Sequence, residues 1–331
     1  MKHRLIFFGS GDFGLPLLEV LRANSSIDLI AVISQPPRPT GRTQQSVSTP
    51  VSDWAKSNKF DVLSWPTLRS DEVIAVIRGL SADTFIVADY GLILPASVLQ
   101  LPSNAALNIH ASLLPKHRGA TPIAAAIMAG DSTTGVSFMK MDAGIDTGPV
   151  LAQYPCEIEV QDTAVTLRHR LADLAATHLD AVLAGWWQGD IKPQIQDDAK
   201  STYAPRLKKI DGQIDWQSAI KIERQIRAYN PWPGVWSTWN NHIIKFIAGQ
   251  VGPSDKLSPG TIIARSQSPG WAVACQTGIF IPHRVQFEGK KPQLAAHIPG
   301  SYPNFIGSKF TVVTDVSSPS PKSPYISPAS I

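Results

Sequence analysis

The N-terminal part of the chain restricts the fold more than any other feature, because two apolar runs flank a glycine-rich turn and a helix. Residues 5–8 and 29–33 are short apolar runs and predict two buried strands. Between them, residues 9–14 (G-S-G-D-F-G) have the spacing G-x-G-x-x-G, and helical periodicity follows to about residue 21. A strand, a helix and a second parallel strand form a βαβ unit. We therefore expect an α/β domain with a Rossmann-like, mostly parallel sheet.

The glycine pattern alone suggests a dinucleotide site, but the acid that binds the ribose in such sites is missing. That acid belongs at the end of the second strand, where this chain has Ser34 and Gln35. The nearest acid, Asp28, precedes the strand. Arg38 is placed to serve an NADP-type site, so an NADP-dependent oxidoreductase stays open as an alternative. We favour a tight strand-to-helix turn beside another ligand.

A third apolar run, residues 105–109, leads into two polar side chains that bear on function. Residues two apart in a strand point the same way, so Asn108 and His110 would project together from the strand end. Open α/β sheets bind ligands beyond the carboxyl ends of their strands. An amide donates to an oxyanion and a histidine moves protons near neutral pH, which favours acyl transfer. A single histidine at a strand end is, however, most often an ordinary polar residue.

Two loops carry further candidate residues. Residues 142–148 join two predicted strands, 135–141 and 149–155, and contain two glycines and two acids. Asp146, 36 residues after His110, is placed to orient that histidine or to accept a proton. Residues 34–50 contain four prolines, two arginines and no acid. We expect a structureless loop there, either a mobile surface loop or one whose arginines contact phosphate or bases.

Charge and composition indicate two domains and a polyanionic partner. The chain has 331 residues, of which 43% are hydrophobic and 17% charged, and it has no run of eighteen apolar residues. Residues 1–200 hold 16 basic and 20 acidic side chains, whereas residues 201–331 hold 14 and 6. The basic second half favours binding to a polyanion, although the same charge would also serve solubility. Two cysteines do not form a disulfide framework and are typical of a reducing, cytoplasmic setting.

We expect four parts along the chain. Residues 1–189 form the α/β catalytic domain, and residues 190–205 form a polar linker. Short alternating apolar runs after residue 235 predict that residues 206–310 form a small, OB-like β-barrel, a fold that often binds nucleic acid. Residues 311–331 are rich in serine and proline, and we expect them to be disordered.

Taken together, the motifs resemble a known family. Residues 108–120 (N-I-H-A-S-L-L-P-K-H-R-G-A) and 142–148 (D-A-G-I-D-T-G) are similar to the two hallmark motifs of the folate-dependent formyltransferases. Within that superfamily, three further stretches resemble the methionyl-tRNA formyltransferase family: residues 35–42 (Q-P-P-R-P-T-G-R), 90–95 (Y-G-L-I-L-P) and 227–234 (R-A-Y-N-P-W-P-G). The likeness runs in order over about residues 4–295.

The resemblance implies an enzyme that transfers a formyl group from 10-formyltetrahydrofolate to the α-amino group of methionyl-initiator tRNA for translation initiation, without a metal. It implies that Asn108 stabilises the oxyanion and that His110 manages protons at the leaving folate nitrogen. Asp146 would orient His110 and help to remove the proton of the amine. The folate pocket would be lined by two segments: Tyr90, Gly91 and Leu92, and Ser112, Leu113, Leu114 and Pro115.

For the tRNA, the resemblance implies that Arg38 and Arg42 enter the acceptor stem and that the basic barrel binds the tRNA body. Many family members have a lysine-rich stretch where this chain has T-Q-Q-S at residues 43–46, which suggests fewer phosphate contacts. Two alternatives remain: a formyltransferase acting on an amino-sugar nucleotide, and a tRNA-binding protein without catalysis. We expect a monomer, located in the cytoplasm or in an organelle with bacterial-type translation.

Overall fold

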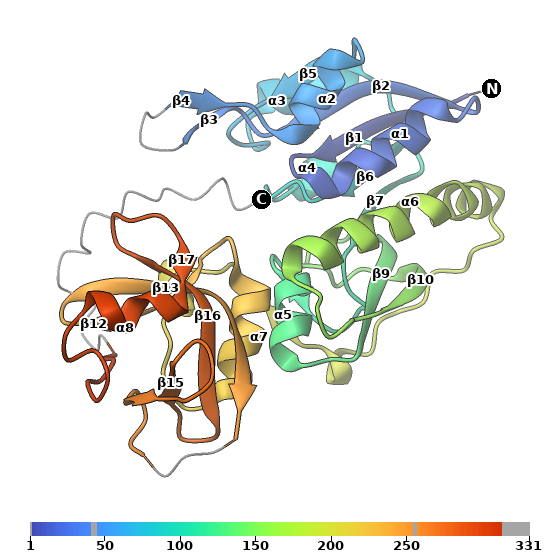
Figure 1. The fold of residues 1–331 in the computed structure, drawn as a ribbon. Coiled ribbons are helices and arrows are strands. Elements are labelled where there is room, and N and C mark those ends of the chain that lie inside the picture. The colour runs from blue at the N-terminus through green and yellow to red at the C-terminus, as the bar shows by residue number, and fades with distance from the viewer. Residues whose placement is uncertain (1, 41–44, 254–256, 313–331) are drawn as a thin grey trace.

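The computed structural model describes residues 2–40, 45–253 and 257–312, which form two lobes. Figure 1 shows one lobe coloured blue to green and a second coloured yellow to red, joined side by side. No helix among these residues is long and apolar enough to cross a membrane.

The first lobe is built on a seven-stranded sheet, which confirms the predicted Rossmann-like fold. Five adjacent strands run parallel; the sixth, β9, is antiparallel to them, and the seventh, β10, is antiparallel to β9. In spatial order the strands are β5 (Val62–Ser64), β2 (Ile27–Ser34), β1 (His3–Gly9), β6 (Thr84–Ala88), β7 (Ala105–His110), β9 (Thr133–Lys140) and β10 (Val150–Glu157).

Helices cover both faces of this sheet. On one face lie α1 (Leu15–Ala23), α2 (Pro50–Ser57), α5 (Pro122–Ala129) and α6 (Ala164–Gln188). On the other face lie α3 (Asp71–Gly79) and α4 (Ala96–Leu99). In β1, Leu5 and Phe7 pack on the first face and Ile6 and Phe8 on the second. A strand buried on both faces is apolar throughout, which explains why its sequence does not alternate.

The second lobe is an antiparallel, curled sheet around an aromatic core, which confirms the predicted barrel. Its strands are β12 (Val235–Trp239), β13 (His242–Gly252), β14 (Ile262–Ala264), β15 (Trp271–Ala274), β16 (Ile279–Phe287) and β17 (Gln293–Leu294). Register shifts between β13 and β16 near Ala248 bend the sheet. Gly249 is needed there, because a Cβ atom would lie 2.2 Å from the Phe280 ring. Large side chains such as Trp216 and Trp271 fill the interior, and the short α8 (Ile298–Ser301) packs against it.

Helix α7 (Ala219–Tyr229) joins the two lobes by packing against α5. Arg224 Nη1 donates to the carbonyl of Ala129 at 3.3 Å, and Arg227 Nη1 donates to the carbonyl of Asp162 at 3.1 Å. Helix α7 begins at Ala219 because the Ser218 side chain accepts from Lys221 N and caps the helix.

The loop at residues 34–50 differs from the prediction, because part of it is paired. Strand β3 (Arg38–Thr40) runs antiparallel to β4 (Gln45–Val47), and Figure 1 shows this hairpin projecting from the first lobe. The expectation of a structureless loop was wrong for these residues. Arg38 lies on β3 and is exposed, whereas Arg42 lies outside the described residues.

The segment predicted as a linker crosses the surface of the first lobe. We call residues 191–204 the strap. Gln194 and Val150 exchange two backbone hydrogen bonds of 2.8 Å, and β11 (Tyr203–Ala204) pairs with β8 (Arg118–Gly119). At the far end of the second lobe, Thr311 N still donates to the carbonyl of Thr238, while residues 313–331 of the predicted tail lie outside the described residues.

Candidate active site

Three candidate residues meet at the carboxyl end of β7. The Asn108 amide donates to Asp146 Oδ1 at 3.1 Å, and His110 Nδ1 lies 3.5 Å from Asp146 Oδ2. The backbone N–H of Gly119 donates to the same Oδ2 at 2.8 Å. His110 and Asp146 are both largely buried, with side chains 6% and 15% exposed. The structure therefore brings together the amide, the imidazole and the carboxylate that the sequence singled out.

Both ring nitrogens of His110 face oxygen atoms. Nε2 lies 3.0 Å from the carbonyl of His117, and Nδ1 faces Asp146. A neutral imidazole carries one N–H and donates to only one of these oxygens, whereas the charged ring donates to both. The two oxygens on either side of the ring therefore fix the orientation of the imidazole beside Asp146.

Among the residues that the structure describes, one N–H of the Asn108 side chain has no acceptor. Its amide nitrogen carries two N–H groups, and one of them is used by Asp146. Asn108 is partly exposed at the strand end, so the second N–H is available to an incoming carbonyl oxygen. An amide fixed in this way is suited to stabilise a negative charge that develops on a reacting carbonyl.

The loops that bring these groups together need unusual backbone conformations. Asp146 has φ 53° and His117 has φ 57°, both in the left-handed region that non-glycine residues seldom adopt. Gly119 has φ 116°, and a Cβ atom there would lie 2.5 Å from the carbonyl oxygen of Ala204 in β11. The residue type of Gly119 does not indicate that it contributes to the site, since it does so through its backbone N–H.

Replacing Gly119 with alanine should therefore destabilise the protein. The strained φ and the contact with β11 together force the backbone to move, and overpacking of this kind costs about 1–3 kcal/mol. Thermal or denaturant unfolding measures the change. Gly79, where a Cβ atom meets nothing within 4 Å, supplies the matched control. An unchanged unfolding free energy for Gly119→Ala would show that the β8–β11 pairing is looser than the structure indicates.

The glycine-rich turn after β1 is occupied by protein groups. The N–H groups of Ser10 and Gly11 donate to the carbonyl of Asp89 at 3.0 and 3.3 Å. Ser10 Oγ and the Gln35 side chain both donate to the carbonyl of Tyr90, at 3.1 and 2.6 Å. In a dinucleotide site, the N–H groups of this turn would face phosphate. The turn here instead secures the loop after β6, which weighs against the NADP alternative.

A half-buried ion pair next to this turn was not predicted. Arg168, on α6, contacts Asp89 at 2.5 Å and Asp12 at 3.5 Å. Burial raises the pKa of the Asp89 carboxyl even though Arg168 acts in the opposite direction. Asp89 follows β6 directly, at the same sheet edge as His110, so its position at a strand end was a usable signal. Nothing in the sequence indicated its partner Arg168, which lies 79 residues away.

The remaining candidates lie in two environments. The side chains of Tyr90 and Leu114 are buried in the core, and burial raises the pKa of the Tyr90 phenol. Ser112 is also buried, and its hydroxyl donates to the carbonyl of Lys116 at 2.6 Å. By contrast, Gly91 is exposed and Leu92 is half-buried. Two more candidates line a cavity of about 360 Å³ beside His117 and Asp131, namely Leu113 and Pro115.

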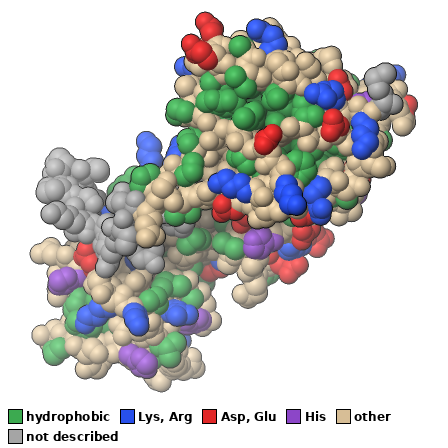
Figure 2. Space-filling view, turned by 90° about the horizontal axis from the view of Figure 1, so that it is seen from above, with side chains coloured by type: hydrophobic (Ala, Val, Ile, Leu, Met, Phe, Trp, Pro, Cys, Tyr) green, Lys and Arg blue, Asp and Glu red, His purple; other side chains and the backbone are tan. Residues whose placement is uncertain are grey.

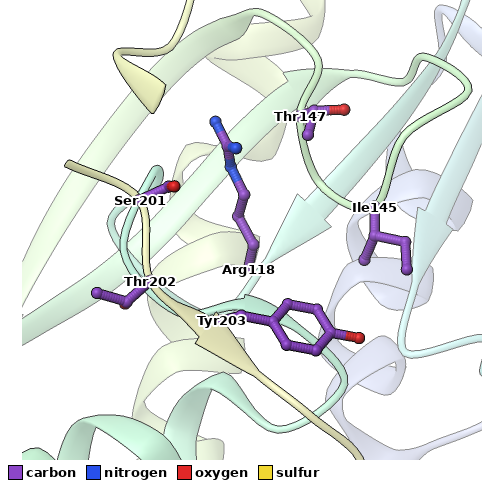
Figure 3. Close-up of a pocket in the computed structure, with 6 residues that line it drawn as sticks. All are labelled: Arg118, Ile145, Thr147, Ser201, Thr202 and Tyr203. Carbon is purple, nitrogen blue, oxygen red and sulfur yellow. The ribbon is translucent and has the colours of Figure 1, made fainter. Parts of the chain in front are cut away.

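A second cavity, of about 420 Å³, lies between the Asp146 loop and the strap. Figure 3 shows the Tyr203 ring pointing toward Ile145, and Arg118 extending between the segments that carry Thr147 and Ser201. Ile145 and Thr147 flank Asp146 in sequence, so this cavity adjoins the candidate site.

Comparisons with known proteins show the family to which the chain belongs. Residues 1–183 match the family model "Formyl transferase", and residues 206–300 match "Formyl transferase, C-terminal domain". The methionyl-tRNA formyltransferase of Pseudomonas fluorescens is 39% identical over 289 residues, which span 87% of this chain and 90% of that protein. The chain belongs to the methionyl-tRNA formyltransferase family.

Solved structures support the fold of this methionyl-tRNA formyltransferase family member. The methionyl-tRNA formyltransferase from Clostridium thermocellum superposes with a TM-score of 0.52 at 16% identity, covering 75% of this chain and 93% of that one. The sugar 3N-formyltransferase WlaRD, solved with dTDP and 5-N-formyl-THF, gives a TM-score of 0.59 at 19% identity, covering 88% of this chain and 99% of that one. At these identities the likeness concerns the fold alone.

Proposed function

We propose that this chain transfers a formyl group from 10-formyltetrahydrofolate to the α-amino group of methionyl-initiator tRNA. The observation that carries the proposal is the 39% identity to a methionyl-tRNA formyltransferase over 90% of that protein's length. The convergence of Asn108, His110 and Asp146 supplies groups suited to the chemistry.

In the proposed mechanism, the amine attacks the formyl carbon and a new N–C bond forms. The free N–H of Asn108 donates to the oxygen as its negative charge develops. The proton of the amine passes to the Asp146 and His110 pair, and the imidazole returns a proton to the folate nitrogen as its bond to the formyl carbon breaks. Protons are thereby conserved, and no group outside the two substrates and these side chains is required.

The two substrates are proposed to approach from different sides. The folate would bind to two segments: the loop after β6, with Gly91 and Leu92, and the segment from Ser112 to Pro115. Because the side chains of Tyr90 and Leu114 are buried, these two residues would act through their backbone atoms. Figure 2 shows a hollow between the lobes, with Lys and Arg side chains along the edge of the larger lobe. The tRNA would bind along this hollow and over the barrel, with the β3–β4 hairpin and its Arg38 at the acceptor stem.

An assay with two acceptors tests the proposal. Purified protein is incubated with 10-formyltetrahydrofolate and either methionyl-initiator tRNA or a dTDP-linked amino sugar, and the products are identified by mass spectrometry. We expect formylmethionyl-tRNA and no formylated sugar. Transfer to the sugar alone would favour the second candidate, which the likeness to the WlaRD fold suggests. No transfer to either acceptor, with tRNA binding retained, would instead indicate a binding protein.

We expect Arg38 and Arg42 to contribute phosphate contacts. Each arginine that neutralises one phosphate adds about one unit to the slope of log affinity against log salt concentration. The double variant Arg38→Ala, Arg42→Ala should therefore bind tRNA more weakly and with a slope smaller by about two. Binding measured at several salt concentrations checks this. Arg22→Ala is the control, because Arg22 pairs with Glu19 near the end of α1. Equal slopes for all three proteins would contradict the assignment.

We further propose that the enzyme acts as a monomer, in the cytoplasm or in an organelle with bacterial-type translation. Sedimentation of the purified protein with and without tRNA tests the first part.

A further inference from the structure

The Gln196 side chain of the strap forms hydrogen bonds with the loop that carries Asp146. Gln196 Nε2 donates to the carbonyl of Asp146 at 2.8 Å and to the carbonyl of Gly148 at 2.6 Å. One amide therefore uses both of its N–H groups on two backbone oxygens of the same tight loop. The contact links residues 50 positions apart, from a segment outside the sheet to the candidate catalytic carboxylate.

Gln196 is itself fixed from the other side. Its Oε1 accepts from Arg118 Nε at 3.0 Å and from Nη2 at 2.9 Å. The Arg118 side chain is only 9% exposed, and its Nη2 also contacts Asp198 Oδ1 at 2.8 Å. Figure 3 shows Arg118 reaching between the Asp146 loop and the strap. The amide of Gln196 is thus fully hydrogen-bonded and has one orientation available.

The loop around Asp146 needs such support. Asp146 has φ 53°, a conformation that an aspartate leaves easily unless its neighbours prevent it. The loop contains Gly144 and Gly148, whose backbones are intrinsically free. Within the loop, Asp142 Oδ1 accepts from Gly144 N and from Thr147 Oγ1, but these bonds do not involve Asp146. Gln196 accordingly supplies the hydrogen bond to the Asp146 carbonyl.

We propose that Gln196 is a positioning residue for formyl transfer, an inference that rests on the proposed function. By binding the carbonyls on either side of Thr147, it orients the Asp146 carboxylate toward Asn108 and His110. Displacing a catalytic group by about 1 Å can slow a reaction about a hundredfold without changing how substrate binds. The strap thereby acts on the rate of the reaction rather than serving only as a connection between lobes.

Two substitutions separate this role from a structural one. Gln196→Glu retains an oxygen for Arg118 but cannot donate to the two carbonyls when ionised, and Gln196→Met is similar in length and uncharged. For both variants we expect kcat to fall about ten- to a hundredfold, with the KM of each substrate changed less than about threefold. We also expect the pH profile of kcat to shift, because the Asp146–His110 geometry changes. Partial unfolding alone would lower kcat by the same factor at every pH and would not shift the pH profile.

Gln194→Ala is the matched control. Gln194 is an exposed strap residue that, within the described part of the chain, forms hydrogen bonds only through its backbone. Its kcat should equal that of the unchanged chain. The inference is overturned if either Gln196 variant keeps kcat within about threefold, if the loss lies in KM, or if Gln194→Ala loses as much activity.

Failure of the proposed function is distinguishable from failure of this inference. If the unchanged chain transfers no formyl group, the proposed function fails. Amide exchange in residues 142–148 still tests the contact without any substrate, because loss of the Gln196 donors should speed exchange in that loop. Unchanged exchange in Gln196→Met would show that Gln196 does not restrain the loop, whatever the reaction.

Discussion

Replacing Asp146 with asparagine lowers kcat for formyl transfer by about 10²- to 10⁴-fold, the usual contribution of a positioned acid or base. All of the groups around this carboxylate are donors or can become donors: the Asn108 amide at Oδ1, and Gly119 N and His110 Nδ1 at Oδ2. Only a carboxylate accepts at both oxygens. In the Asp146→Asn variant, the side-chain NH2 group would face one of these donors, and the neutral amide could not accept the proton of the amine.

The double variant of Asp146→Asn and His110→Ala sharpens this test. Residues that act as a unit give strongly non-additive losses, so the double variant should be about as slow as the slower single variant. Single-turnover kinetics with methionyl-tRNA provides the rates, and thermal unfolding confirms that each variant is folded. Losses that multiply would show that the two side chains act independently. Retention of more than about a tenth of kcat by Asp146→Asn would remove the carboxylate from the mechanism.

Asn108→Ala has the second largest expected effect, a loss of about 10²- to 10³-fold in kcat, as for other single oxyanion donors. The variant loses the donor aimed at the formyl oxygen and also leaves Asp146 Oδ1 without its partner. Since the interaction with the oxygen strengthens only as charge develops, the KM of each substrate should change little.

Asn104→Ala is the matched control for this substitution. Asn104 precedes the same strand at its opposite end and donates to the carbonyl of Asp83 through its backbone. It should retain full activity. If Asn108→Ala raises KM while kcat is unchanged, the amide binds substrate and does not stabilise the oxyanion.

Apolar periodicity was sufficient to predict much of the first lobe. The apolar run at residues 5–8 and the equal parity of Asn108 and His110 are properties of neighbouring residues, so they could be identified in the sequence. The structure puts these two side chains at one sheet edge with Asp146. The glycine turn was assigned to a ligand other than a dinucleotide, and its N–H groups in fact contact the loop after β6.

The errors have a common origin in backbone contacts. The β3–β4 hairpin was missed because prolines and polar residues there lack the alternation by which strands are identified. The contacts of the strap with the first lobe could not be predicted either, because they are polar and leave no apolar pattern in the sequence. For the same reason neither Gly119 nor Gln196 was proposed as a site residue, although each contacts Asp146.

The sequence by itself determined the central strands and helices of the first lobe, the family motifs and the polar residues at the ends of strands, because these depend on spacing along the chain. Only the tertiary structure decided which distant backbone atoms meet Asp146 and which candidate side chains, such as Tyr90 and Leu114, are buried. The physical reason is that backbone N–H and C=O groups are nearly the same in every residue. Their partners are therefore set by the path of the folded chain and cannot be inferred from residue identity.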